Sequence, residues 1–157
     1  MKTLSREIEE IILQHGNRGM SRLYQIMTPG FCGRAARMIL GNRGVVLIGT
    51  GFPFKEPELV PRYLREFQRV LPASGGIRRG GSAALDLCYL AEGILEGFWE
   101  EDYLSPWDVA AGLVVLQEAG GLATRIDGSE IDLKNGSILA ANSLEVMEEL
   151  GALVRGP

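Results

Sequence analysis

Hydrophobic and polar positions alternate along the first third of the chain in blocks that suit helices and a strand. The spacing of apolar residues predicts an amphipathic helix over residues 3–14, with its glutamates on the opposite side, and a second helix over about 28–40. Residues 45–48 read VVLI, an apolar and partly β-branched run that ends at a glycine. A run of this kind is typical of a buried parallel strand.

Further along the chain, segments with helical spacing alternate with short apolar runs. Helices are predicted after Pro57, over about 82–92 and 106–119, and from residue 143, and strands at about 75–78, 94–100, 122–126 and 137–141. Alternating helices and strands indicate an α/β fold. We expect a layered, parallel or mixed sheet of about five strands with helices on both faces, in one domain that spans residues 1–157.

Composition narrows the classes of partner. With 157 residues, 46% of them hydrophobic, the chain is large enough for one compact core. The net charge of −4 gives no basic surface for nucleic acid phosphates. No apolar run reaches the 18 residues of a membrane span, and the N-terminus does not resemble a signal peptide. We therefore expect no nucleic acid partner, no membrane partner and a cytoplasmic location.

Neither the cysteines nor the single histidine shows the spacing of a metal site. Cys32 and Cys88 both lie in apolar stretches, which favours reduced thiols in the core. His15 is expected at the end of the first helix, where a partial positive charge is favourable. A nucleophile paired with His15 is not expected. These residue types therefore give no catalytic group of their own.

Five segments, taken in order, resemble the inositol monophosphatase family. Residues 76–88 (GIRRGGSAALDLC) are similar to the run that precedes a substrate-contacting helix in that family. Residues 106–112 (PWDVAAG) and 118–121 (EAGG) resemble its C-terminal signature. Residues 50–54 (TGFPF) and 138–142 (ILAAN) fall where the family has similar segments. The resemblance covers about residues 50–150, two-thirds of the chain.

The resemblance implies magnesium-dependent hydrolysis of a phosphate monoester, with Asp108 as a metal ligand. Magnesium needs several hard oxygen ligands. The family's early glutamate and its Asp-Pro-x-Asp-Gly-Thr loop do not appear in this sequence. The nearest similar run, residues 126–129 (IDGS), is interpreted as a turn. Asp108 alone has a second interpretation, as a carboxylate that caps the start of a helix.

The resemblance also implies substrate contacts. Ser82 and Ala83 stand where the family offers backbone N–H groups at a helix start, a place suited to anions. The alternative is that Ser82 is an ordinary N-cap. The family's sugar-contacting glutamate matches Glu101 by its distance from the Trp-Asp motif but Glu100 by local pattern. Arg78 is a candidate phosphate ligand or a surface charge at a strand end.

The first fifty residues resemble a different family. Residues 16–23 (GNRGMSRL), 29–37 (PGFCGRAAR) and 46–52 (VLIGTGF) are similar to the N-terminus of D-glutamate cyclases. The acidic motif expected after that strand in a cyclase is replaced by residues 55–59 (KEPEL). This pattern predicts a chimera of recombined or designed origin, with residues 1–50 cyclase-like and residues 51–157 monophosphatase-like.

The missing carboxylates lead to one main functional expectation and one alternative. The main expectation is a non-catalytic chimeric protein with no confident catalytic residue and no cofactor, in which Asp108 and the substrate contacts are vestigial. The alternative is a residual magnesium-dependent inositol phosphate hydrolase or a phosphosugar-binding module, completed by oligomerisation. Expected partners are a second copy of the chain and a small phosphate or phosphosugar.

Overall fold

The computed structural model describes four stretches of the chain, namely residues 47–51, 56–101, 104–134 and 136–157. The helices predicted over residues 3–14 and 28–40, together with His15 and Cys32, lie outside them.

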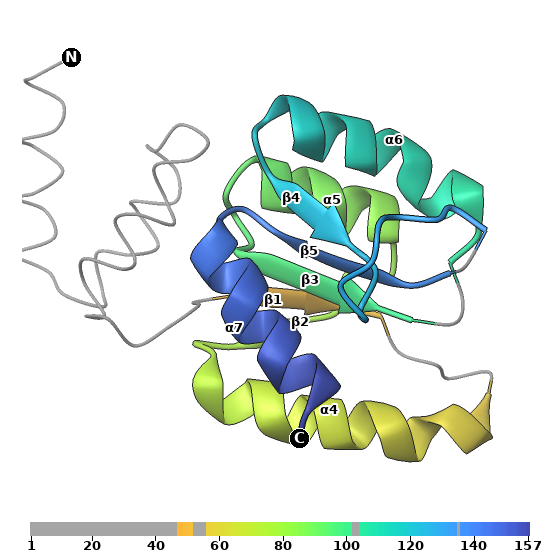
Figure 1. Cartoon of the computed structure of the whole chain (residues 1–157), viewed down its shortest axis with the longest axis vertical. Coiled ribbons are helices and arrows are strands. Elements are labelled where there is room, and N and C mark those ends of the chain that lie inside the picture. Colours follow the sequence, from red (N-terminus) through yellow and green to blue (C-terminus); the bar gives the residue numbers. More distant parts are fainter. Residues whose placement is uncertain (1–46, 52–55, 102–103, 135) are drawn as a thin grey trace, which may run out of the picture.

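The described stretches form five strands and four α-helices (Figure 1). The strands are β1 (Ile48–Thr50), β2 (Ile77–Arg78), β3 (Gly97–Glu100), β4 (Leu122–Thr124) and β5 (Ile138–Ala141). The helices are α4 (Val60–Ala73), which follows a 3-10 turn η2 (Pro57–Leu59), α5 (Ala83–Ala91), α6 (Pro106–Glu118) and α7 (Leu144–Arg155). Every strand and helix predicted between residues 57 and 157 is present.

All five strands join one mixed sheet in the order β2-β1-β3-β5-β4. Strand β1 is parallel to both β2 and β3, with Ile48 opposite Ile77 on one side and Gly97 on the other. Strand β5 runs antiparallel to β3 and to β4. The predicted α/β fold with about five strands is confirmed, and the sheet is mixed rather than purely parallel.

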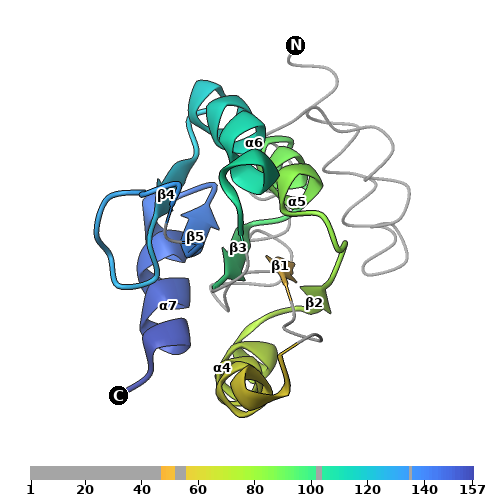
Figure 2. The same ribbon diagram turned by 90° about the vertical axis from the view of Figure 1, so that its right-hand side faces the viewer.

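Helices cover both faces of this sheet, as predicted (Figure 2). Helices α5 and α6 pack side by side on one face, and α4 and α7 pack on the other. Each face has its own apolar core, one centred on Leu87, Phe98 and Leu116, the other on Trp99 and Leu150. The helices are short, and none in the described stretches is long and apolar enough to cross a bilayer.

Two strands are shorter than their apolar runs predict, because turns use the hydrogen bonds at their ends. The run at 94–100 begins in the turn after α5, where the N–H groups of Ile94 and Leu95 donate to the carbonyl of Tyr89. Strand β3 therefore starts only at Gly97. The run at 122–126 ends early because the Arg125 N–H donates to the Ser129 carbonyl and closes the predicted 126–129 turn.

A buried polar network lies between β3 and α4. The indole Nε1 of Trp99 donates to Oε2 of Glu66 at 3.0 Å, and both side chains are almost fully buried. Arg62 lies 3.5 Å from the other Glu66 oxygen. Burial raises the pKa of Glu66, and the hydrogen bond from Trp99 partly offsets this effect. The network ties the central strand to α4.

Candidate functional site

The candidate site lies where the parallel strands end and two helices begin. Strands β1 and β3 end at Thr50 and Glu100 on the same edge of the sheet. Helices α5 and α6 each start a few residues after a strand that ends at this edge, β2 and β3 respectively. Ligands of α/β sheets bind at the carboxyl ends of parallel strands, and helix N-termini there favour anions.

Ser82 and Ala83 are placed at the start of α5. Ser82 is the N-cap residue, with an extended backbone, but its side chain makes no capping hydrogen bond. Gly81 precedes it with a φ of 82°, a conformation that glycine adopts without strain. Ser82 therefore occupies the N-cap position, as one interpretation predicted, but its hydroxyl does not cap the helix. The first N–H groups of α5 are not satisfied by that side chain.

The structure separates the two neighbouring glutamates. Glu100 lies on the site side, with its carboxyl group packed so closely on Gly51 that a Cβ there would fall 1.9 Å from Cδ of Glu100. The Glu101 carboxylate lies 3.5 Å from Arg62 of α4, and its backbone N–H donates to the hydroxyl of Tyr63. Consecutive residues at a strand end point to opposite faces, so only Glu100 joins the site.

Two further site residues, Asp86 and Arg79, were not singled out from the sequence. Asp86 lies on the first turn of α5, is 3% exposed, and packs against Gly80, where a Cβ would fall 2.6 Å from its Oδ1. A lone carboxylate within the apolar helix AALDLCYLA was the available signal. Arg79 lies near enough to lower the pKa of both Asp86 and Glu100.

Two carboxyl groups of the site, those of Asp86 and Glu100, have raised pKa values. Burial raises the pKa of Asp86 to about 6, and the charge of Arg79 partly offsets this rise. Burial, with the charges of Asp86 and Asp108, raises the pKa of Glu100 to about 7. At neutral pH the site therefore holds a mixture of neutral and ionised carboxyl groups, which can both donate and accept hydrogen bonds.

Asp86→Asn should make the protein more stable at pH 8 and leave its stability at pH 3 nearly unchanged. The folded pKa of Asp86 lies above its unfolded value, so its ionisation weakens folding as the pH rises from about 4 through 6. We expect a gain of about 2 kcal/mol at pH 8, measured by urea unfolding. Glu148→Gln, at an exposed carboxylate, is the control. An equal gain at both pH values would contradict the burial argument.

Asp108 lies at the start of α6, where it caps the helix. Its Oδ2 accepts a hydrogen bond from the Ser105 N–H at 2.9 Å, so the cap interpretation is confirmed. Across residues 47–51, 56–101, 104–134 and 136–157, no three His, Cys, Asp or Glu side chains come together in a way that could hold a metal ion. The described carboxylates therefore do not by themselves fit the oxygen-rich shell that magnesium needs.

Arg78 and the 126–129 run behave as surface features. Arg78 ends the edge strand β2, is exposed, and its guanidinium donates to the Ile77 carbonyl of its own strand. In the run IDGS, the Asp127 carboxylate accepts hydrogen bonds from the N–H and hydroxyl of Ser129. Gly128 has a φ of 88°. The predicted turn is confirmed.

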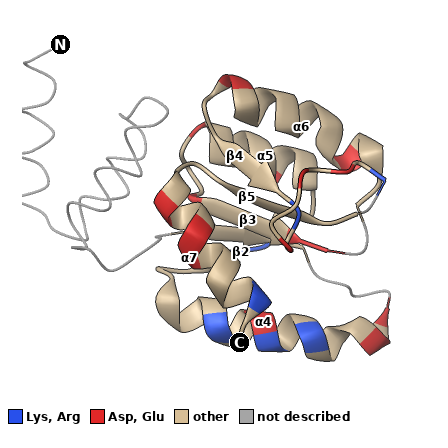
Figure 3. Ribbon diagram, in the orientation of Figure 1, with Lys and Arg blue, Asp and Glu red and all other residues tan. Residues whose placement is uncertain are grey.

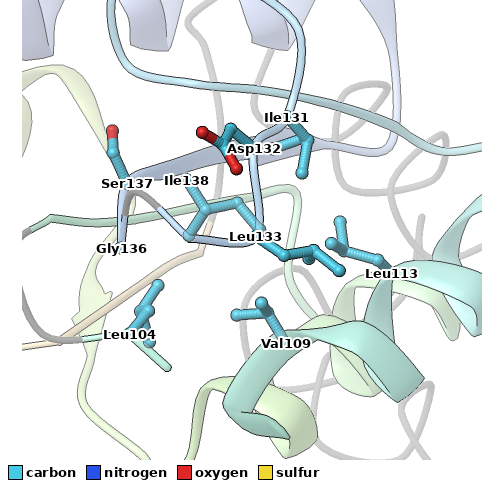
Figure 4. A pocket seen from close by; sticks show the side chains of 9 residues that line it. All are labelled: Leu104, Val109, Leu113, Ile131, Asp132, Leu133, Gly136, Ser137 and Ile138. Carbon is cyan, nitrogen blue, oxygen red and sulfur yellow. The ribbon is translucent and has the colours of Figure 1, made fainter. Parts of the chain in front are cut away.

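A small hollow lies between the start of α6 and the segment that precedes β5. Figure 4 shows the side chains around it, which come from Leu104, Val109, Leu113, Ile131, Asp132, Leu133, Gly136, Ser137 and Ile138. Its volume of about 10 Å³ is what a single water molecule requires. It is too small for a sugar phosphate.

Comparisons with known proteins agree with the motifs of residues 50–150. The model of the inositol monophosphatase family matches residues 42–156. The Nus factor SuhB of Pseudomonas aeruginosa is 46% identical over 99 residues, which are 62% of this chain and 36% of that protein. The inositol-1-monophosphatase of Mesorhizobium japonicum is 45% identical over 98 residues, again 62% and 36% of the two chains.

Solved structures show the same relationship. The inositol monophosphatase of Anabaena has a TM-score of 0.64 and 37% identity, over 71% of this chain and 45% of that one. The suppressor protein SuhB of Bartonella henselae has a TM-score of 0.66 and 36% identity, over 72% and 42%. The chain thus spans about two-fifths of the length of these relatives.

These matches correct two predictions from the sequence. The family match begins at residue 42, ahead of the expected junction near residue 50, so the strand β1 belongs with the monophosphatase-like part. The comparisons give no support to a D-glutamate cyclase segment. The prediction of a non-catalytic recombined or designed chimera is wrong, because a continuous family match joins relatives named as phosphatases. The chain belongs to the inositol monophosphatase family.

Proposed function

We propose that this chain provides the substrate-binding half of a phosphomonoester hydrolase of the inositol monophosphatase type. The observation that carries the proposal is the arrangement at the carboxyl ends of β1 and β3. The uncapped start of α5, the Glu100 carboxyl group and Asp108 at the start of α6 all belong to this edge. The sequence identity between this chain and relatives named inositol-1-monophosphatases supports the same substrate class.

Each group has a distinct role in this proposal. The first N–H groups of α5, at Ser82 and Ala83, donate hydrogen bonds to an oxygen of the phosphorylated polyol. Glu100, with a pKa of about 7, hydrogen-bonds a ring hydroxyl as acceptor or as donor. The charge of Arg79 offsets the negative charge that the ligand adds. Glu101 stabilises the fold through α4 and does not contact the substrate.

Magnesium enters the proposal only with ligands from beyond the described residues. When bound in such a site, magnesium polarises the phosphate and activates water. The described residues contribute at most Asp108, whose Oδ2 also caps α6. We therefore assign no chemical step to the metal on these residues. A second copy of the chain is one source of the remaining carboxylates.

Asp108→Asn should lower magnesium-dependent release of phosphate from inositol monophosphate at least tenfold. The amide oxygen of asparagine keeps the hydrogen bond from Ser105 and removes the charge, so the fold should stay as stable as before. Phosphate release is measured with and without magnesium. Asp132→Asn, an exposed position outside the site, is the control and should stay within twofold. Unchanged release in Asp108→Asn would contradict the assignment of Asp108.

Binding of a polyol phosphate without hydrolysis is the second candidate function. It is favoured by the lack of a three-ligand metal cluster in the described part of the chain. Calorimetry with inositol monophosphate separates the two candidates. A heat of binding that is smaller in Glu100→Gln, together with no release of phosphate, supports binding without hydrolysis. No heat at millimolar ligand and no phosphate release would contradict both.

A further inference from the structure

Asp86 is a buried acidic residue that the apolar packing around it does not require. It lies on the first turn of α5, within the run AALDLCYLA, and is 3% exposed. Neither α5 nor α6 contains Lys or Arg, and Figure 3 shows that basic residues gather on α4, at the other face of the sheet. Among the described residues, its carboxyl group is influenced by burial and by the charge of Arg79, and by no hydrogen bond. Burial of such a group costs folding free energy, which is typical of functional sites.

The side chain of Asp86 fills the space between strand β1 and the turn that leads into α5. On the side of the sheet, its Cβ lies 3.8 Å from the position that a Cβ of Gly49 would occupy. On the other side, a Cβ at Gly80 would fall 2.6 Å from Oδ1 and 3.3 Å from both Cγ and Oδ2. The carboxyl group therefore occupies the space that a side chain at residue 80 would need.

The backbone of Asp86 holds the same turn at its other end. Its N–H donates to the carbonyl of Ser82 at 2.9 Å and closes the first turn of α5. Between these two contacts, Gly81 has a φ of 82°. Two consecutive glycines have great conformational freedom, and the Ser82 side chain makes no capping hydrogen bond that would restrict them. Asp86 thus fixes the turn both before and after Gly81.

We propose that Asp86 is a positioning residue, whose carboxyl group supports the Gly80–Gly81 turn and so sets the direction of the N–H groups at Ser82 and Ala83. The inference rests on the proposed function, in which these N–H groups bind an oxygen of the phosphorylated polyol. Asp86 acts through the shape of its side chain, since it is too buried to contact the ligand itself. A hydrogen bond weakens steeply when its angle changes, so a loosened turn lowers the affinity for the ligand.

A double-mutant cycle in the full chain tests this contact. Asp86→Ala should raise the Kd for inositol monophosphate, measured by calorimetry, at least fivefold, because the turn loses its support. Gly80→Ala should have a similar effect, because the new methyl group displaces the carboxyl group. In the Asp86→Ala background, however, Gly80→Ala should raise the Kd less than twofold, because the space is then empty. Leu85→Ala, which shortens an exposed side chain on the same turn, is the control and should stay within twofold.

A conservative variant and hydrogen exchange separate positioning from a general loss of stability. Asp86→Asn keeps the shape of the side chain and should recover most of the affinity that Asp86→Ala loses. In Asp86→Ala, the amide of residue 86 should lose its hydrogen bond to Ser82 more often. Its protection against exchange should therefore fall at least tenfold more than that of Leu150 in α7.

Two outcomes of the binding measurements would overturn the proposal. One is an equal effect of Gly80→Ala in the two backgrounds, and the other is an affinity of Asp86→Asn as low as that of Asp86→Ala. Failure of the unchanged chain to bind inositol monophosphate would contradict the proposed function instead. The exchange comparison then decides the role of Asp86, and equal losses of protection at residues 86 and 150 would overturn it.

Discussion

Trp99→Ala is expected to lower the free energy of unfolding by about 4 kcal/mol. Trp99 is 1% exposed and is the largest fully buried side chain in the described part of the protein. Its removal leaves a cavity between β3 and the α4/α7 layer. It also takes away the indole donor of the buried Glu66 carboxylate, which then lacks that hydrogen bond. Urea unfolding followed by far-UV circular dichroism measures the loss.

The second tryptophan provides a matched control. Trp107 is 79% exposed at the start of α6, so Trp107→Ala should change the unfolding free energy by no more than about 0.5 kcal/mol. Trp99→Phe should lose less than Trp99→Ala, because it keeps an aromatic ring in the core. Equal losses at the two tryptophans would show that β3 does not hold Trp99 in the interior as described.

Gly112→Val is expected to cost about 3 kcal/mol and to weaken ligand binding at the same time. A Cβ at Gly112 would lie 2.8 Å from the Leu87 Cβ and 3.1 Å from the carbonyl oxygen of Ala84. The second contact is with backbone, so the two helices must separate to accept a side chain. Such a shift moves the N-terminus of α5, where Ser82 and Ala83 lie. Unfolding and calorimetry with inositol monophosphate measure the two effects.

The neighbouring residue separates crowding from helix propensity. Ala111→Val introduces the same β-branched side chain at an exposed position of α6. It should cost less than about 1 kcal/mol and leave ligand binding unchanged. A loss at Ala111 as large as that at Gly112 would contradict the close contact between α5 and α6 as its cause.

Most of the fold from residue 57 onward could be predicted because each element has a strong local pattern. The apolar run around Ile138, like the one around Ile48, favoured a strand, and Pro106 marks the start of a helix clearly. Strand direction was harder to predict. Whether β5 pairs parallel or antiparallel with β3 depends on the path of the chain between residues 101 and 138, and side-chain periodicity does not record that path.

The site was only partly predictable, because its chemistry arises from burial. The motif around Ser82 located the helix start, and the Trp-Asp motif located Asp108. The choice between Glu100 and Glu101 required the position at which β3 ends. The residue count indicated Glu101 and the local pattern indicated Glu100, and a shift of one residue moves a side chain to the other face of the sheet. Asp86 could be recognised as a site residue only from the fold, because a carboxylate is unusual only when it is buried.

The place of β1 within the sheet also governs the order in which the protein assembles. Strand β1 lies between β2 and β3, yet it precedes both in the chain. The hydroxyl of Thr50 in β1 donates a hydrogen bond to the carbonyl of Trp99, 49 residues later. Strands β4 and β5 are close in sequence and pair with each other. During synthesis the side of β1 that pairs with β3 must therefore stay unpaired until β3 has emerged, whereas β2 is available earlier. The slowest step of folding should be the pairing of β1 with β3.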